Sequence, residues 1–206
     1  MNITKYNKTL FNKRIIILIF SLLFEFAMTF FTIHIYQYFN LTIVEKRFLQ
    51  CSIYILFIFF TFLMMKLSEY TFEEIGLLKR KLLLQVFVGF IITGIFIMLL
   101  LTMGWRPHSL TLYSTFSFLL VGFSEELFSR GLILKLIQDL VTSNHLSVFI
   151  QAIIFGLLHF PIQGNIGQVI FAFLMALIYG AIRVEFSDTI GIVTFTVSHW
   201  LYNLLL

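Results

Sequence analysis

The sequence predicts an all-α protein, a polytopic bundle of transmembrane helices. Of its 206 residues, 60% are hydrophobic and 12% are charged, and that charged share is about half of what a soluble domain carries. The apolar residues gather in long runs, and a helix needs about 20 mostly apolar residues to cross a bilayer. Proline is also rare, with 2 residues, which suits long helices packed in lipid.

Seven apolar segments follow one another along the chain, so we expect about seven membrane spans. We expect the first to be a retained helix, because no small-residue cleavage site closes it as in a signal peptide. The stretch 72–81 is expected to be a cytoplasmic connector, either an amphipathic interfacial segment or a solvated loop. The seven segments, of which the fifth and sixth are short, are residues 15–39, 49–65, 82–103, 113–137, 146–160, 167–182 and 189–206.

The distribution of Lys and Arg predicts the orientation. With a cytoplasmic N-terminus, ten basic residues fall on the inner side and three on the outer side, as the positive-inside rule requires. We therefore expect a multi-pass protein of the cell membrane with an external C-terminus. The inner residues are Lys5, Lys8, Lys13, Arg14, Lys66, Lys79, Arg80, Lys81, Lys135 and Arg183, and the outer ones are Lys46, Arg47 and Arg106.

The charge distribution and the cysteine content argue against nucleic-acid binding, disulfides and a cysteine-based metal site. The net charge of +4 does not indicate a nucleic-acid partner, because the basic residues lie in short loops between apolar stretches. The single cysteine, Cys51, excludes a disulfide framework and a cysteine-based metal site.

Three of the apolar segments carry polar side chains that lipid disfavours. A charge at the bilayer centre costs about 3 kcal/mol on insertion scales, so such residues usually have a function. A passive bundle gains nothing from collecting two carboxylates, two imidazoles, a guanidinium and an amide, and the joint pattern favours a hydrolytic site. The residues are Glu125, Glu126 and Arg130 in the fourth segment, His159 in the fifth, and His199 with Asn203 in the seventh.

Helix geometry separates these residues into groups. Glu126 and Arg130 are four residues apart, so they share a face and can form an ion pair. This pair could support the site, or it could be purely structural. Glu125 is turned about 100° away and has no cation at that spacing on its own helix. It is the freer carboxylate and the candidate general base. His199 and Asn203 also share a face and could stabilise a developing oxyanion.

Other polar residues in the apolar segments are expected to be background. Glu25 could line the same cavity, but a snorkelling or interhelical contact is favoured. His34, His108 and His145 fall near span ends and receive no role. His159 taken alone could equally be an interhelical hydrogen bonder.

Three short strings in these segments carry a family resemblance. The strings EELFSR, FGLLH and HWLYN resemble the motifs EExxxR, FxxxH and HxxxN of the CPBP intramembrane proteases. This family is also called Abi or CAAX-protease-like, and it includes the type II prenyl-protein endopeptidases. The resemblance covers about residues 80–206 and implies a membrane-embedded endopeptidase of helical architecture. It implies that Glu125 activates a water, His159 positions it, His199 and Asn203 stabilise the oxyanion, and Glu126 and Arg130 organise the site.

The resemblance also implies a division of the chain. We expect residues 1–80 to hold a basic segment, two helices and the connector, and residues 81–206 to hold the catalytic core. We favour a glutamate-activated water with no required cofactor. The alternative is Zn²⁺ or another divalent metal bound by Glu125, His159 and His199. That arrangement lacks a free base, because Glu126 would have to serve as base while pairing with Arg130.

The expected height of His159 conflicts with a shared site. With a cytoplasmic N-terminus, Glu125 and His199 fall near mid-membrane, whereas His159 falls near the outer end of its span. A shared site therefore requires tilted or broken helices, for example with residues 161–165 dipping into the protein.

We expect the substrate to be a peptide or a membrane protein within the lipid bilayer, and the sequence predicts no oligomeric state. The composition is typical of bacteria, where prenylated substrates are not expected. The resemblance then implies bacteriocin immunity or maturation, or peptide signalling. A non-catalytic immunity or scaffold protein is the alternative. A proton-coupled carrier is less favoured, because the sequence shows no two-fold internal repeat.

Overall fold

The computed structural model describes residues 3–77, 81–102, 104, 112–160 and 164–205. Every regular element within these ranges is a helix, so the predicted all-α class is confirmed. The helices are α1 (Ile3–Tyr38), α2 (Ile43–Ser68), α3 (Leu82–Thr102), α4 (Leu112–Glu126), η1 (Leu127–Ile133), α5 (Leu134–Leu140), α6 (Asn144–Leu158), α8 (Ile166–Glu185) and α9 (Ile192–Leu205). Because α4, η1 and α5 follow without a break, these elements correspond to the seven predicted segments.

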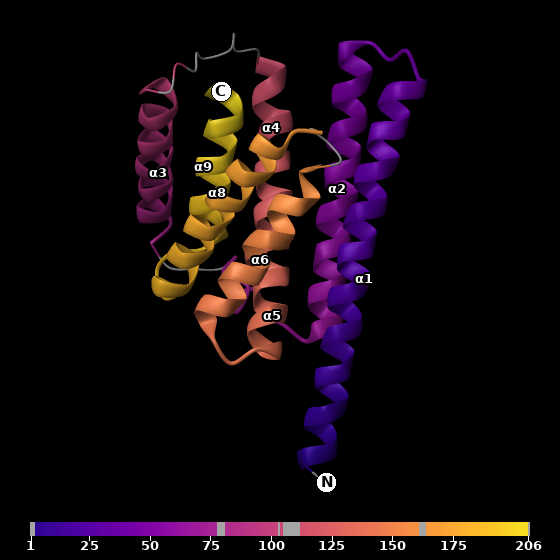
Figure 1. Cartoon of the computed structure of the whole chain (residues 1–206), viewed down its shortest axis with the longest axis vertical. Coiled ribbons are helices and arrows are strands. Elements are labelled where there is room, and N and C mark those ends of the chain that lie inside the picture. The colour runs from indigo at the N-terminus through magenta and orange to yellow at the C-terminus, as the bar shows by residue number, and fades with distance from the viewer. Residues whose placement is uncertain (1–2, 78–80, 103, 105–111, 161–163, 206) are drawn as a thin grey trace.

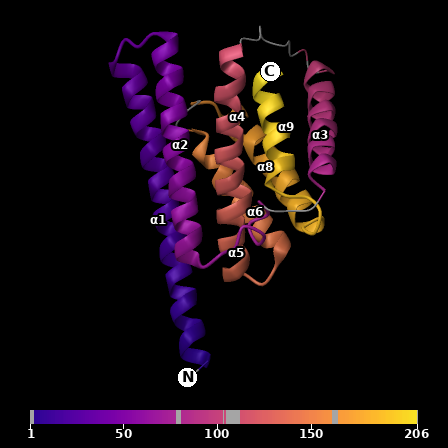
Figure 2. The ribbon, with the colours of Figure 1, turned by 180° about the vertical axis from the view of Figure 1, so that it is seen from behind.

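The helices surround a central column formed by α4, η1 and α5. Figures 1 and 2 agree that α1 and α2 form a hairpin on one side, whereas α3 lies on the opposite side. Between them, α4 packs against both α2 and α9, and α6 packs against α8. The N-terminus lies at one end of the long axis and the C-terminus near the other end (Figure 1). Residues of the central column can therefore face either the hairpin or the remaining helices.

The surface of the bundle is apolar, as a membrane protein requires. Four helices are long and apolar enough to cross a membrane, namely Lys8–Tyr38, Ile43–Ser68, Leu82–Thr102 and Ile166–Glu185. Large side chains on these helices point outward, and Phe59 and Leu83 are 68% and 85% exposed. So many exposed large apolar side chains on helices of this length indicate contact with lipid. The chain is a helical membrane protein.

The described part of the connector after α2 is exposed at residues 72–74 and buried at Ile75 and Gly76. Residues 72–76 form turns, and the Ile75 side chain is fully buried. The backbone N–H of Ile192 donates to the Gly76 carbonyl at 2.9 Å, and Arg183 Nη2 donates to the Glu74 carbonyl at 3.2 Å. Gly76 has φ +81°, and a Cβ there would lie 2.5 Å from the Arg183 guanidinium. The turn therefore packs into the core, while residues 78–80 lie outside the described residues.

The length of α6 resolves the conflict over the height of His159. This helix has 15 residues, so it rises about 22 Å, less than the roughly 30 Å of a hydrocarbon core. Figure 1 shows α6 ending partway along the bundle, beside the middle of the central column. His159, which follows α6 directly, therefore lies at the level of α4 and not at its far end. Residues 161–163, where we expected the chain to dip inward, lie outside the described residues.

Candidate active site

Glu126 and Arg130 form the buried part of the site. Arg130 Nη1 donates to Glu126 Oε1 at 3.1 Å, as the spacing of four residues predicts. The guanidinium lies over the Phe155 ring at 4.2 Å and near the Tyr179 ring at 5.3 Å. Aromatic faces stabilise a desolvated cation, so helices α4, α6 and α8 together hold this charge. Glu126 and Arg130 are 0% and 2% exposed.

Arg130 lies in the π-helical segment η1, in which all seven residues are buried. Segments with this wider turn are frequent at functional sites. The Gln151 amide of α6 donates to the Ser129 hydroxyl in this segment. This hydrogen bond fixes α6 against the wide turn beside Arg130.

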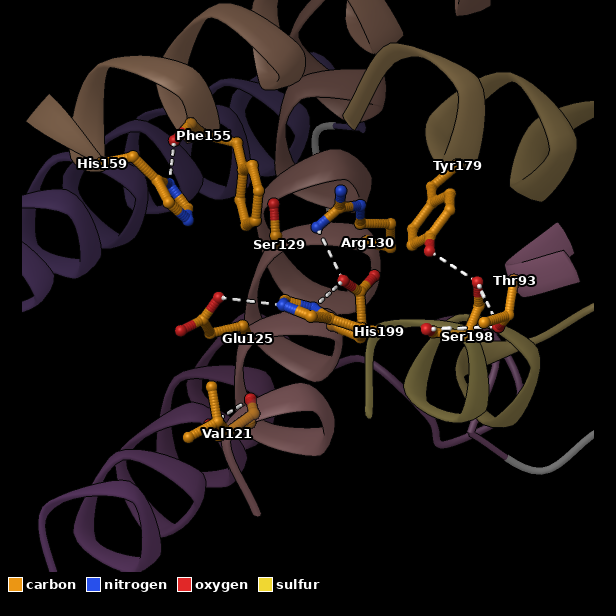
Figure 3. A network of polar contacts seen from close by, with 12 residues as sticks. Thr93, Val121, Glu125, Ser129, Arg130, Phe155, His159, Tyr179, Ser198 and His199 are labelled. Carbon is orange, nitrogen blue, oxygen red and sulfur yellow. Dashed lines mark hydrogen bonds and ion pairs between the residues drawn. The ribbon is translucent and has the colours of Figure 1, made fainter. Parts of the chain in front are cut away.

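His199 of α9 lies between the two glutamates (Figure 3). Its Nδ1 is 2.8 Å from Glu126 Oε1, and its Nε2 is 3.8 Å from Glu125 Oε2. A carboxylate only accepts hydrogen bonds, so Nδ1 carries the hydrogen and donates to Glu126. Gly122 permits this approach, because a Cβ there would lie 3.2 Å from the backbone nitrogen of Trp200.

A second hydrogen-bond network fixes the rotation of α9 around His199. The Tyr179 hydroxyl of α8 donates to Ser198 Oγ at 2.7 Å. The Thr93 hydroxyl of α3 lies 3.2 Å from the same oxygen. Two helices, α3 and α8, thus hold Ser198, the residue of α9 that precedes His199, as Figure 3 shows. The imidazole is thereby kept close to the glutamates of α4.

Glu125 faces a different side of α4 from Glu126, toward α2. The Tyr54 hydroxyl of α2 donates to Glu125 Oε1 at 3.0 Å. The side chain of Glu125 is 15% exposed, whereas that of Glu126 is fully buried. The two neighbouring carboxylates therefore occupy different environments, as their angular separation on a helix predicts.

His159 is held by the residue four positions before it. Its Nδ1 donates to the Phe155 carbonyl at 2.8 Å, and the two rings lie 4.6 Å apart. The phenylalanine of the FGLLH string thus orients the histidine with its backbone and covers Arg130 with its ring. Since Nδ1 carries the hydrogen, Nε2 has a free lone pair.

A cavity of about 170 Å³ lies between α1, α2, α4 and α6. Glu125 and His159 both line it, so the structure brings these two predicted residues to one space. Figure 3 shows the His159 ring directed toward the side of the network on which Glu125 lies. The lining residues are Glu25, Met28, Thr29, Thr32, Ile33, Tyr36, Gln50, Ile53, Tyr54, Phe57, Glu125, Leu158 and His159.

Asn203 and a metal site are not brought into this arrangement. Asn203 lies one turn beyond His199 and is half-buried, but within the described residues no hydrogen bond joins it to the other predicted site residues. No group of three or more His, Cys, Asp or Glu side chains in the described ranges is placed to hold a metal ion. Glu125, His159 and His199, the ligands of the alternative metal mechanism, are therefore not grouped in this way.

Two cavity residues, Tyr54 and Glu25, were not predicted as site residues from the sequence. Tyr54 has no sequence signal, because a tyrosine in an apolar helix is common and its partner Glu125 lies 71 residues away. Glu25 is a charge inside a span, for which we favoured snorkelling or an interhelical contact. The structure places it instead on the cavity that Glu125 lines. The sequence signal for Glu25 is an acidic residue inside an apolar span, the one before the span that contains Tyr54.

The comparisons with known proteins support the family resemblance. Residues 106–205 match the family model described as Type II CAAX prenyl endopeptidase Rce1-like. No curated protein and no solved structure matches the chain. The matched segment contains all three motif strings, whereas α1 and α2 lie outside it.

Proposed function

Residues 106–205 belong to the Rce1-like branch of the CAAX protease family, and we propose that this chain is an intramembrane endopeptidase using a glutamate-activated water. The observation that carries the proposal is the shared cavity of Glu125 and His159. A general base must lie within hydrogen-bond reach of the water that it deprotonates. The cavity provides that space next to the freer of the two carboxylates.

The hydrogen bonds of Glu125 and His159 define how they would hold a water. His159 Nε2 accepts one hydrogen of the water, because its Nδ1 already donates to the Phe155 carbonyl. The Glu125 carboxylate accepts the other hydrogen, while Tyr54 orients that carboxylate from α2. An oxygen lone pair of the water is then free to attack a peptide carbonyl. Glu125 takes the proton as the new C–O bond forms.

The oxyanion and the leaving group complete the reaction. His199 Nε2 donates to the oxyanion when the imidazole carries both protons, a form that the neighbouring carboxylates stabilise. Glu126 and Arg130 hold the other face of the ring and act as positioning residues. Asn203, on the same face of α9, supplies an amide N–H when substrate is bound. The peptide C–N bond then breaks, and Glu125 returns its proton to the departing amine.

Reconstitution in proteoliposomes with a pool of candidate peptides tests this proposal. The wild type, Glu125→Gln and the control Glu185→Gln are compared, because Glu185 is exposed at the end of α8. We expect cleavage by the wild type and the control and its loss in Glu125→Gln. Full cleavage activity of Glu125→Gln would contradict the proposal, because the reaction would not need Glu125 as its base. A wild type that cleaves no peptide would favour a non-catalytic membrane protein. Loss of wild-type cleavage on addition of a chelator would instead favour a metal mechanism.

We also propose a multi-pass protein of the bacterial cell membrane with a cytoplasmic N-terminus, acting in bacteriocin immunity, peptide maturation or peptide signalling. The inner excess of Lys and Arg supports the orientation. A reporter fused to the N-terminus tests it by protease protection in intact cells. Loss of a protective phenotype in Glu125→Gln would connect the cleavage to immunity.

A further inference from the structure

One carboxylate of the cavity takes no part in the proposed reaction. Glu25 lies on α1, and its Oε2 atom is buried with no hydrogen-bond partner among the described residues. Buried polar atoms are nearly always hydrogen-bonded, and an orphaned carboxylate oxygen is costly. A ligand that enters the cavity could satisfy this oxygen.

The other polar side chains of the cavity do not satisfy Glu25. The Thr32 hydroxyl donates to the Met28 carbonyl at 2.7 Å, and the Tyr36 hydroxyl donates to the Lys46 carbonyl at 3.1 Å. The Tyr54 hydroxyl is used by Glu125. No Lys or Arg is among the described lining residues. A cation that contacts Glu25 inside the cavity therefore has to come from the bound molecule.

The remaining wall of the cavity indicates what surrounds such a cation. Its apolar part is formed by aliphatic and aromatic side chains of three helices, which suit apolar residues of a peptide. Glu25 and the reacting groups line the same cavity, so one bound segment can contact both. The apolar lining residues are Met28, Ile33, Ile53, Phe57 and Leu158.

We propose that Glu25 is a specificity residue that binds a Lys or Arg side chain of the substrate peptide near its scissile bond. This inference rests on the proposed endopeptidase function and names its substrate class, an apolar peptide segment with a basic residue. Because α1 lies outside residues 106–205, specificity comes from one part of the chain and the chemistry from another. A charge-assisted hydrogen bond of this kind changes affinity about tenfold to hundredfold.

Pairs of fluorogenic peptides that differ only by Lys or norleucine at one position test this inference. The Lys position is moved stepwise along the peptide, and cleavage is measured for the reconstituted wild type, Glu25→Gln and Glu185→Gln. At one position along the peptide, we expect the wild type and Glu185→Gln to cleave the Lys peptide faster than the norleucine peptide. In Glu25→Gln this preference should fall about tenfold to hundredfold. The charge reversal Glu25→Lys should transfer the preference to peptides with Glu at that position.

Binding of the same labelled peptides to Glu125→Gln, with and without Glu25→Gln, separates this inference from the proposed function. Fluorescence anisotropy gives the affinity without cleavage. If the wild type cleaves no peptide while Glu125→Gln binds Lys peptides with a preference that depends on Glu25, the proposed function is overturned and the cation site is supported. Equal Lys preference with and without Glu25, in cleavage or in binding, would overturn the inference.

Discussion

The two neighbouring glutamates of the central column, Glu125 and Glu126, have the same functional group but differ in exposure and in hydrogen-bond partners. Glu125 faces a cavity, accepts a hydrogen bond from a tyrosine and retains some exposure. Glu126 is fully buried and accepts hydrogen bonds from an arginine and a histidine. A rotation of one residue along a helix is enough to produce both environments. Reactivity and structural support can therefore come from adjacent positions, provided that separate helices pack on each face.

Replacement of Glu125 should have the largest effect on activity. Glu125→Gln keeps the shape of the side chain but removes the base, so we expect the cleavage rate to fall about 100-fold to 10,000-fold. Thermal unfolding in detergent should stay close to the wild type, because this residue borders a cavity. A large loss of thermal stability would show that Glu125 also holds the fold.

The buried pair should show the opposite response. Arg130→Ala leaves the Glu126 carboxylate uncompensated in the core, and breaking such a pair costs about 3–5 kcal/mol of folding free energy. Unfolding temperatures in detergent measure this loss. The double variant Glu126→Gln with Arg130→Met should recover much of the stability and none of the activity. An active double variant would contradict the assignment of Glu126 and Arg130 as positioning residues.

Replacement of Tyr54 tests whether the hairpin takes part in the chemistry. Tyr54→Phe removes the hydrogen bond to Glu125, and hydrogen bonds to charged groups contribute about 1.5–3 kcal/mol. We expect kcat/KM to fall about tenfold, mainly through kcat. Tyr36→Phe is the matched control, because its hydroxyl donates to the Lys46 carbonyl in the same cavity. An equal loss in both variants would indicate a general effect of the cavity wall.

The smallest effect is expected at the end of α2, far from either glutamate. The Lys13 ammonium beside Glu69, 2.8 Å away, lowers the pKa of this exposed carboxyl below its usual value. A carboxyl with a lowered pKa contributes stability above the unfolded-state pKa, and this contribution is lost as the pH falls through the folded-state pKa. Thermal stability should therefore decrease slightly more on acidification in the wild type than in Glu69→Gln. A similar acid dependence in both would remove any role for this surface pair.

The sequence predicts the helices and the ion pair better than the cavity. Apolar runs set the helix count, and a spacing of four residues sets the contact between Glu126 and Arg130. The face that α1 turns toward its neighbours is harder to predict, because a helix in lipid is apolar on nearly all sides. The inward placement of Glu25 therefore comes from packing. The contact of Tyr54 with Glu125 likewise depends on how α2 lies against α4.

Two backbone features also required the structure. The short segment 146–160 predicts the length of α6, but the level of His159 beside α4 depends on how α6 packs against the central column. The π-helical turn around Arg130 has no sequence signature that we could recognise. Phe155 covers Arg130 with its ring and orients His159 with its carbonyl. Neither contact can be predicted without knowing how α6 packs against η1.

The hydrogen bond between Glu126 and His199 has a consequence for biosynthesis. Its two residues are 73 positions apart in the chain, so Glu126 is synthesised well before α9. Until that helix inserts and docks, the site lacks the His199 imidazole that would stabilise the oxyanion. Newly made chains would thus remain inert toward neighbouring membrane proteins during insertion, without a separate inhibitory segment. Activity would begin only with the final packing step.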